Sequence, residues 1–171
     1  MVTHRHEPQD VTSSEGEAEV RPHAPSRPCH FRWRAMGTAA ALYAAVALGT
    51  VIGGLLRALA SLAIHAHAAP GFPWATLFVN VTGSFIIGFY ATLTGPDGRW
   101  FAGPTERQLV MTGICGGYTT FSVFSLETLR LLHDGNLPAA GINVVVSVFA
   151  WLAAVWAGHT IATRVNRLKG S

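Results

Sequence analysis

Residues 108–126 read QLVMTGICGGYTTFSVFSL and contain no charged side chain. A helix crosses a bilayer with roughly 20 mainly apolar residues, so this stretch predicts a membrane span. Three glycines and two threonines fall within residues 113–120 at its centre. Glycine weakens helices and threonine hydroxyls compete for backbone hydrogen bonds, so we expect the helix to be broken there, in mid-membrane. A glycine-lined packing notch between intact helices is the alternative interpretation.

Three more apolar blocks of similar length accompany this stretch. They run from about Met36 to Leu56, from about Trp74 to Thr94 and from about Leu137 to Thr163. Only 12% of the 171 residues are charged, whereas an ordinary soluble domain carries about 25%. The sequence therefore predicts an all-α membrane protein of four transmembrane helices, formed by residues 35–165.

The two ends of the chain differ from this domain in composition. Residues 1–34 hold four prolines and few large apolar residues, so we expect a disordered N-terminal tail. No short basic region leads into an apolar stretch at the start, so no signal peptide is predicted. Residues 166–171 are expected to form a short basic C-terminal tail. Short loops join the spans, so both termini should lie on one side of the membrane.

Polar side chains inside the spans are the candidates for function, because polar groups in lipid tend to face a protein interior or a water-filled path. Thr76, Asn80 and Ser84 recur at every fourth position, which places them on one face of the second helix. Asn143 and Ser147 have the same spacing in the fourth helix. Each face is either part of a polar path or a hydrogen-bonded contact between helices.

The segment after the expected break combines rings and hydroxyls. Phe121 and Phe124 share one face at a spacing of three, and Ser122 and Ser125 share another. The positive edges of such rings could line a path for a small anion, although phenylalanines in membrane helices usually face lipid or the core. Backbone carbonyls freed at the break could coordinate a cation such as sodium.

Several classes of function are disfavoured by what the sequence contains. The net charge of +3 and the scattered basic residues do not suggest nucleic-acid binding. Two cysteines make no disulfide framework, and His65 and His67 are better interpreted as solvated loop residues than as a metal site. The sequence holds no common hydrolase or metalloprotease motif, so we do not expect an enzyme. No charged residue lies in the middle of a predicted span, which argues against a proton-coupled pump.

The sequence from residue 37 to about residue 163 resembles the Fluc/CrcB family of fluoride channels. The resemblance rests on three motifs and on the looser match Asn143-x-x-x-Ser147. The motifs are Gly53-Gly-Leu-Leu-Arg57, Thr76-Leu-Phe-Val-Asn80-Val-Thr-Gly83-Ser84-Phe-Ile-Ile-Gly88 and Gly113-Ile-Cys-Gly116-Gly117-Tyr-Thr119-Thr120-Phe121-Ser122-Val-Phe124-Ser125-Leu-Glu127. The third motif is highly specific.

The resemblance implies a fluoride-selective channel that exports fluoride from the cytoplasm across a cell membrane, expected to be a bacterial inner membrane, and so lowers its toxicity. It also implies a dimer of oppositely oriented subunits, with two narrow fluoride paths along the interface and a structural sodium ion at the centre. The backbone carbonyls of Gly116 and Thr119 would hold the sodium. The path would comprise Asn80, Phe121, Phe124, Thr120 and Ser147, with Arg57 at a vestibule and Ser84, Ser122, Glu127 and Asn143 as further positions.

Two other classes of membrane protein are alternatives. A small four-helix drug-exporting transporter needs a carboxylate in its first helix, but no acidic residue occurs between Glu19 and Asp97. A membrane assembly or signalling protein without a conduction path is the other alternative. Fluoride efflux from proteoliposomes would separate all three classes.

The basic residues predict how the chain inserts, because Lys and Arg are enriched on cytoplasmic flanks. Leaving aside Arg5, the side that holds the termini carries nine of them: Arg21, Arg27, Arg32, Arg34, Arg99, Arg107, Arg164, Arg167 and Lys169. The opposite side carries only Arg57 and Arg130. We therefore expect one-way insertion with both termini in the cytoplasm. An antiparallel channel would then need a homologous second chain of opposite bias; a homodimer that ignores the bias is the competing hypothesis.

Overall fold

The computed structural model describes residues 29–69, 71–96 and 98–167. All the regular secondary structure in these residues is helical. Four helical spans are long and apolar enough to cross a membrane, as predicted: Gly37–His65, Trp74–Leu93, Pro104–His133 and Leu137–Arg167. The helices in chain order are α1 (Cys29–His65), α2 (Trp74–Leu93), α3 (Pro104–Gln108), the π-helix η1 (Leu109–Cys115), α4 (Gly116–Tyr118), α5 (Phe121–His133) and α6 (Leu137–Arg167).

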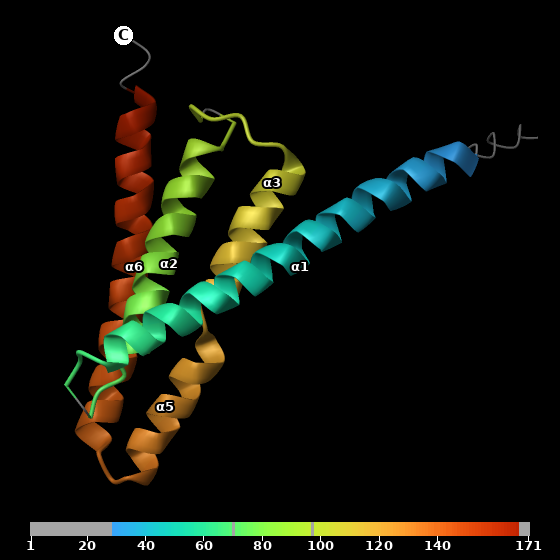
Figure 1. The fold of residues 1–171 in the computed structure, drawn as a ribbon. Helices are drawn as coiled ribbons and strands as arrows, with labels where there is room; N and C mark the ends of the chain where they lie inside the picture. Colours follow the sequence, from blue (N-terminus) through green and yellow to red (C-terminus); the bar gives the residue numbers. More distant parts are fainter. Residues whose placement is uncertain (1–28, 70, 97, 168–171) are drawn as a thin grey trace, which may run out of the picture.

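Helices α2 and α6 lie side by side and form the most extensive contact in the molecule (Figure 1). Two glycines permit this closeness. A Cβ on Gly88 would lie 2.5 Å from the Val155 carbonyl oxygen, and one on Gly158 would meet the Phe85 backbone. Both positions therefore require a residue without a side chain, which is the usual device for bringing helices together in lipid.

Helix α1 crosses the remaining helices steeply, and its N-terminal part projects away from them (Figure 1). It packs mainly against η1 and α4. Gly49 and Gly53 form the contact, because a Cβ on Gly49 would lie 2.8 Å from the Gly113 Cα and one on Gly53 would meet the Ile114 carbonyl. The two glycines, spaced four residues apart, thus allow α1 to approach η1 closely.

The chain from α3 to α5 is not one regular helix. Residues Leu109–Cys115 form a π-helix, and a single turn, Gly116–Tyr118, follows. Thr119 (φ −81°, ψ 158°) and Thr120 (φ −150°, ψ 123°) are then extended, and the helix resumes at Phe121. Figure 1 shows Thr119 and Thr120 as part of the short non-helical segment that leads into α5.

Four predicted helix boundaries are wrong. The first helix does not end at Leu56 but continues past Arg57 to His65, because residues 58–64 contain no glycine or proline that would stop it. The third span starts at Pro104 and runs to His133, where Gly135 (φ +74°) turns the chain. The fourth helix extends to Arg167, beyond Thr163.

These boundaries change two other statements made from the sequence. Arg57 lies inside the first span, in its last third, so the prediction that the span ends before this residue is wrong. His65 is the last residue of α1 and not a loop residue, although it is exposed. Residues 29–34 are helical, whereas residues 1–28 of the predicted N-terminal tail and residues 168–171 of the C-terminal one lie outside the described residues.

Candidate functional site at the helix break

The side chain of Asn80 is bonded to both backbone groups of Thr120. Its Nδ2 donates to the Thr120 carbonyl at 2.9 Å, and its Oδ1 accepts from the Thr120 N–H at 2.8 Å. Both residues are buried. In a continuous helix the Thr120 N–H would bond to the carbonyl of Gly116. The amide on α2 therefore stands in for a helical partner and stabilises the extended backbone at the break.

This arrangement releases two backbone carbonyls from helical hydrogen bonding. The carbonyl of Gly116 loses the Thr120 N–H to Asn80. The carbonyl of Thr119 would ordinarily receive the N–H of Val123, which donates instead to Thr120 Oγ1 at 3.3 Å. Carbonyls released in this way can bind a cation.

Arg57 lies beside one of these carbonyls. Its Nη1 donates to the Thr119 oxygen at 3.4 Å, a long hydrogen bond that reaches from α1 to the break. Arg57 lines neither of the two cavities described below. The structure therefore places this guanidinium at the break, while its proposed position at a vestibule stays a prediction.

Three aromatic rings contact one another in series next to the break, two from α5 and one from α6. The centroids of Phe121 and Phe124 are 5.5 Å apart, and Phe124 meets Trp151 of α6 edge to face at 5.0 Å and 75°. Phe124 is only 7% exposed, whereas Phe121 is 71% exposed. The two phenylalanines thus differ in this single chain: one packs inside it, and the other points out of it.

Asn143 and Ser147, two polar residues of α6, are hydrogen-bonded within the chain. Asn143 Nδ2 donates to Thr128 Oγ1 at 2.9 Å, and Ser147 Oγ donates to Asn143 Oδ1 at 3.3 Å. Asn143 and Ser147 are each 1% exposed. These bonds agree with the simpler interpretation of this face as a contact between helices. They leave a further role in an ion path as a prediction.

A cavity of about 330 Å³ opens at the break and brings together six of the predicted site residues. Those six are Asn80, Ser84, Gly116, Thr119, Thr120 and Phe121. Its other lining residues are Gly83, Ile87, Met111, Cys115 and Trp151, so no charged side chain lines it. Phe124, Ser122, Ser147 and Asn143 lie outside this lining. The lining residues include one amide side chain, three hydroxyl side chains and two aromatic ones.

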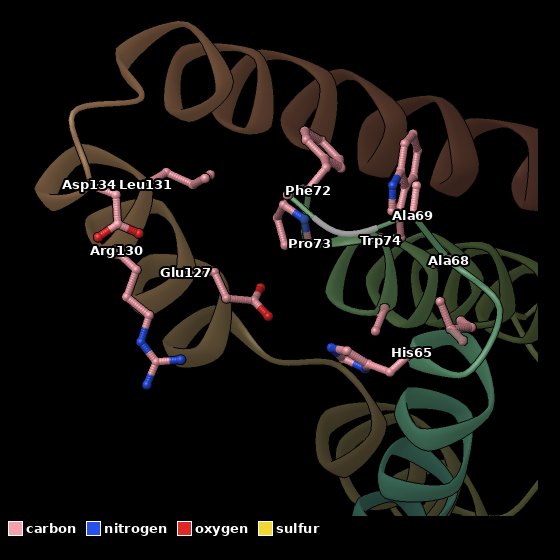
Figure 2. Close-up of a pocket in the computed structure, with 13 residues that line it drawn as sticks. His65, Ala68, Ala69, Phe72, Pro73, Trp74, Glu127, Arg130, Leu131 and Asp134 are labelled. Atoms are coloured by element: carbon pink, nitrogen blue, oxygen red, sulfur yellow. The ribbon is translucent and has the colours of Figure 1, made fainter.

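A second cavity, of about 360 Å³, lies where the end of α1, the start of α2 and the end of α5 meet. Figure 2 shows Glu127 and His65 pointing toward each other across it, whereas Arg130 points away. The Oε2 atom of Glu127 is buried and has no hydrogen-bond partner among the described residues. This cavity collects the charged groups that the first cavity lacks.

Sequence reasoning missed the π-helix and the part played by Trp151. No pattern in residues 109–115 distinguishes the π-helix, which packs against α1, from an α-helix. Trp151 was detectable, since it continues the spacing of four that joins Asn143 to Ser147. Among the residues that the structure describes, no group of three or more His, Cys, Asp or Glu side chains could hold a metal ion.

Comparison with known proteins gives a consistent result. Residues 44–159 match the family described as "CrcB-like protein, Camphor Resistance (CrcB)". Two similar proteins are named fluoride-specific ion channel FluC 1. The chain is 64% identical over 132 residues to the one from Rhodopseudomonas palustris (strain BisB18), and this alignment covers 77% of this chain and 94% of the relative. It is 61% identical over 140 residues to the one from Bradyrhizobium diazoefficiens, and that alignment covers 82% of this chain and 94% of the relative.

A third relative, at lower sequence identity, also carries the name of a fluoride channel. The fluoride-specific ion channel FluC of Opitutus terrae is 55% identical to this chain over 130 residues, with 76% of this chain and 98% of the relative covered. In all three cases the aligned part of this chain corresponds to nearly the whole relative. The similarity therefore concerns the helical domain as a complete unit.

Proposed function

The chain belongs to the CrcB-like family, and we propose that it is a subunit of a fluoride-specific ion channel that exports fluoride from the cytoplasm and so lowers its toxicity. The observation that carries this proposal is the alignment of relatives named as fluoride channels over 94–98% of their own length. The cavity at the break supports it, because its lining of ring edges, amide and hydroxyl groups without a charged side chain suits a small anion that must bind and then leave.

Fluoride is small and strongly hydrated, so a narrow path has to replace its water with other donors. Asn80 has two N–H groups on Nδ2, and Thr120 uses one of them. The second N–H is available to an anion in the cavity that Asn80 lines. The edge of Phe121 supplies a weaker positive potential beside it. Neither group carries a full charge, so the ion is not held permanently.

The working unit is proposed to be a dimer of oppositely oriented chains, with the helix break at mid-depth in the membrane. Gly116 and Phe121 support this, because both are exposed although they lie at the break of a membrane span. Irregular backbone at membrane depth is tolerated only where protein or a water-filled cavity covers it. A second chain facing the break would provide that cover and would close the cavity from the open side.

A sodium ion between the two breaks is part of the proposal. The carbonyls of Gly116 and Thr119 fit this role, because both have lost their helical donors. A Cβ on Gly116 would meet nothing within 4 Å, so the backbone is accessible there. Arg57 also donates to the Thr119 carbonyl, whose second lone pair is free for a cation. Bound sodium would offset the carbonyl dipoles and join the two subunits.

The chain is a multi-pass membrane protein. Its location in a bacterial inner membrane is proposed from its family, and the cytoplasmic position of both termini is proposed from its basic residues. Fluoride efflux from proteoliposomes tests the proposed function. The chain is reconstituted alone and together with a homologous chain from the same genome, and a fluoride electrode records release. Fluoride efflux without chloride efflux is expected from at least one preparation. Absence of fluoride efflux from both would overturn the proposal.

A further inference from the structure

Trp151 carries a hydrogen-bond donor that the folded chain does not use. Its indole Nε1 is buried and has no acceptor among the described residues. Indole nitrogen is a donor only, and a buried donor without an acceptor destabilises a folded protein. Buried donors of this kind are uncommon enough that each calls for an explanation, such as an ion that binds there.

The surroundings of Trp151 connect it to the cavity at the break. Trp151 lines that cavity together with Asn80, Thr120 and Phe121. It also meets Phe124 edge to face, so it extends the row of two phenylalanine rings from α5 onto α6. On α6 it follows Ser147 by one helical repeat of four, but Ser147 donates to Asn143 and does not accept from Trp151.

We propose that Trp151 is a third ring of the fluoride path and that its indole N–H donates a hydrogen bond to a dehydrated fluoride ion. This inference rests on the proposed channel function. Fluoride is the strongest hydrogen-bond acceptor among the halides, and a neutral N–H binds it without the permanent hold of a cation. Because the nitrogen is buried, the ion must lose its water before contact, and a small rotation of the ring is needed to present the N–H to the cavity. Both requirements disfavour larger, weakly accepting anions such as chloride.

The substitution Trp151→Phe tests the donor separately from the ring. Phenylalanine keeps an aromatic ring against Phe124 but removes the N–H. Fluoride efflux from proteoliposomes should fall about tenfold, the effect of losing one hydrogen bond to a charged partner. Trp156→Phe is the matched control, since Trp156 lies on the same helix and is 69% exposed, and it should leave efflux unchanged. Equal efflux from the two variants would overturn the proposal.

A second measurement follows the response of the wild-type protein, and the variant serves only to assign a resonance. In ¹⁵N-labelled protein the Trp151 indole resonance, assigned by its absence from Trp151→Phe, should move downfield on addition of fluoride but not of chloride. The Trp156 resonance should not move. An indole signal that ignores fluoride in a conducting wild-type channel would overturn the role of Trp151 while leaving the channel function intact. Absence of fluoride efflux from the wild-type chain, both alone and together with a homologous chain, would instead overturn the proposed function itself.

Discussion

Asn80 illustrates how one side chain sets the local backbone. Its two hydrogen bonds to Thr120 compensate for the helical bonds that the extended threonines forgo. Spacing alone identifies Asn80 as a buried polar residue, but it does not reveal that the partner is backbone forty residues away. Through these two bonds Asn80 positions the backbone at the break, and it is also a candidate donor to fluoride.

The ring edges of Phe121 and Phe124 are expected to stabilise fluoride in its path. Replacing either residue with isoleucine keeps the bulk and removes the ring edge. Aromatic contacts of this kind contribute about 0.5–1.5 kcal/mol, so each variant should show about two- to tenfold lower fluoride efflux. The measurement is efflux per reconstituted dimer, with assembly checked by size-exclusion chromatography.

Phe149→Ile is the control for these two variants, because Phe149 lies on α6 and is 69% exposed. It should conduct like the wild type. Phe124 also packs against Trp151, so its substitution should reduce thermal stability more than that of the exposed Phe121. Wild-type efflux from both phenylalanine variants would rule out the ring path.

At the scale of the helices, close approach of α1 to η1 and α4 is expected to hold the break in place. Gly53→Ala would drive a Cβ into the Ile114 carbonyl, and its extra volume should cost about 1–3 kcal/mol. Gly54→Ala, one residue along, meets nothing within 4 Å and should be neutral or stabilising by up to about 1 kcal/mol. Thermal unfolding in detergent compares the two. Similar midpoints for both variants would contradict this account of the contact.

The second element-scale prediction concerns sodium at the break. Gly116 has φ −65° and open space around its Cβ position, so Gly116→Val should leave the single chain folded. In the dimer the added side chain should block the carbonyls and reduce dimer formation in sodium. Gly141→Val is the control, since its Cβ would also meet nothing within 4 Å.

The readout for this prediction is the dimer fraction in sodium and in a larger cation. Wild-type protein should lose dimer when sodium is replaced, and Gly116→Val should be insensitive to the exchange because its site is already blocked. A wild-type dimer and a fluoride efflux that are the same in both salts would refute a structural sodium ion.

At the scale of the whole molecule, charge is expected to decide orientation. Nine basic residues on the side of the termini against two on the other predict one-way insertion. The span limits in the structure enclose Arg57 and Arg130 on one side, and Arg107, Arg164 and Arg167 on the other. The expectation of cytoplasmic termini, and of a homologous partner chain in the opposite orientation, therefore continues to rest on the sequence pattern.

Single cysteines placed in the N-terminal tail, in a background with Cys29 and Cys115 replaced, test this orientation. When this chain is expressed alone, a membrane-impermeant reagent should label the tail from the cytoplasmic face only, and fluoride efflux should be absent. Co-expression with a homologous chain should restore efflux. Labelling from both faces together with efflux from this chain alone would favour the homodimer.

The sequence by itself determined the class of the fold and the candidate site residues in the spans. Apolar blocks near 20 residues long leave a chain few options in lipid, because every backbone group must be bonded internally, so helices follow from composition alone. The glycines and threonines in residues 113–120 identified the segment where the helix is broken, because the backbone preference of a residue depends mainly on its own type. Helix ends were predicted less accurately. The charge of Arg57 indicated an end to the first helix, but no residue directly after it stops a helix, and α1 continues to His65.

Only the tertiary structure decided how that segment is stabilised. Asn80 meets Thr120, Arg57 meets the Thr119 carbonyl, and Trp151 meets Phe124 because α1, α2 and α6 pack around the break. These pairs join residues up to 62 positions apart in the chain, and no local preference encodes them. Which donors are used and which, like the indole of Trp151, remain without an acceptor depends on this packing, because a hydrogen bond requires two groups within about 3 Å of each other.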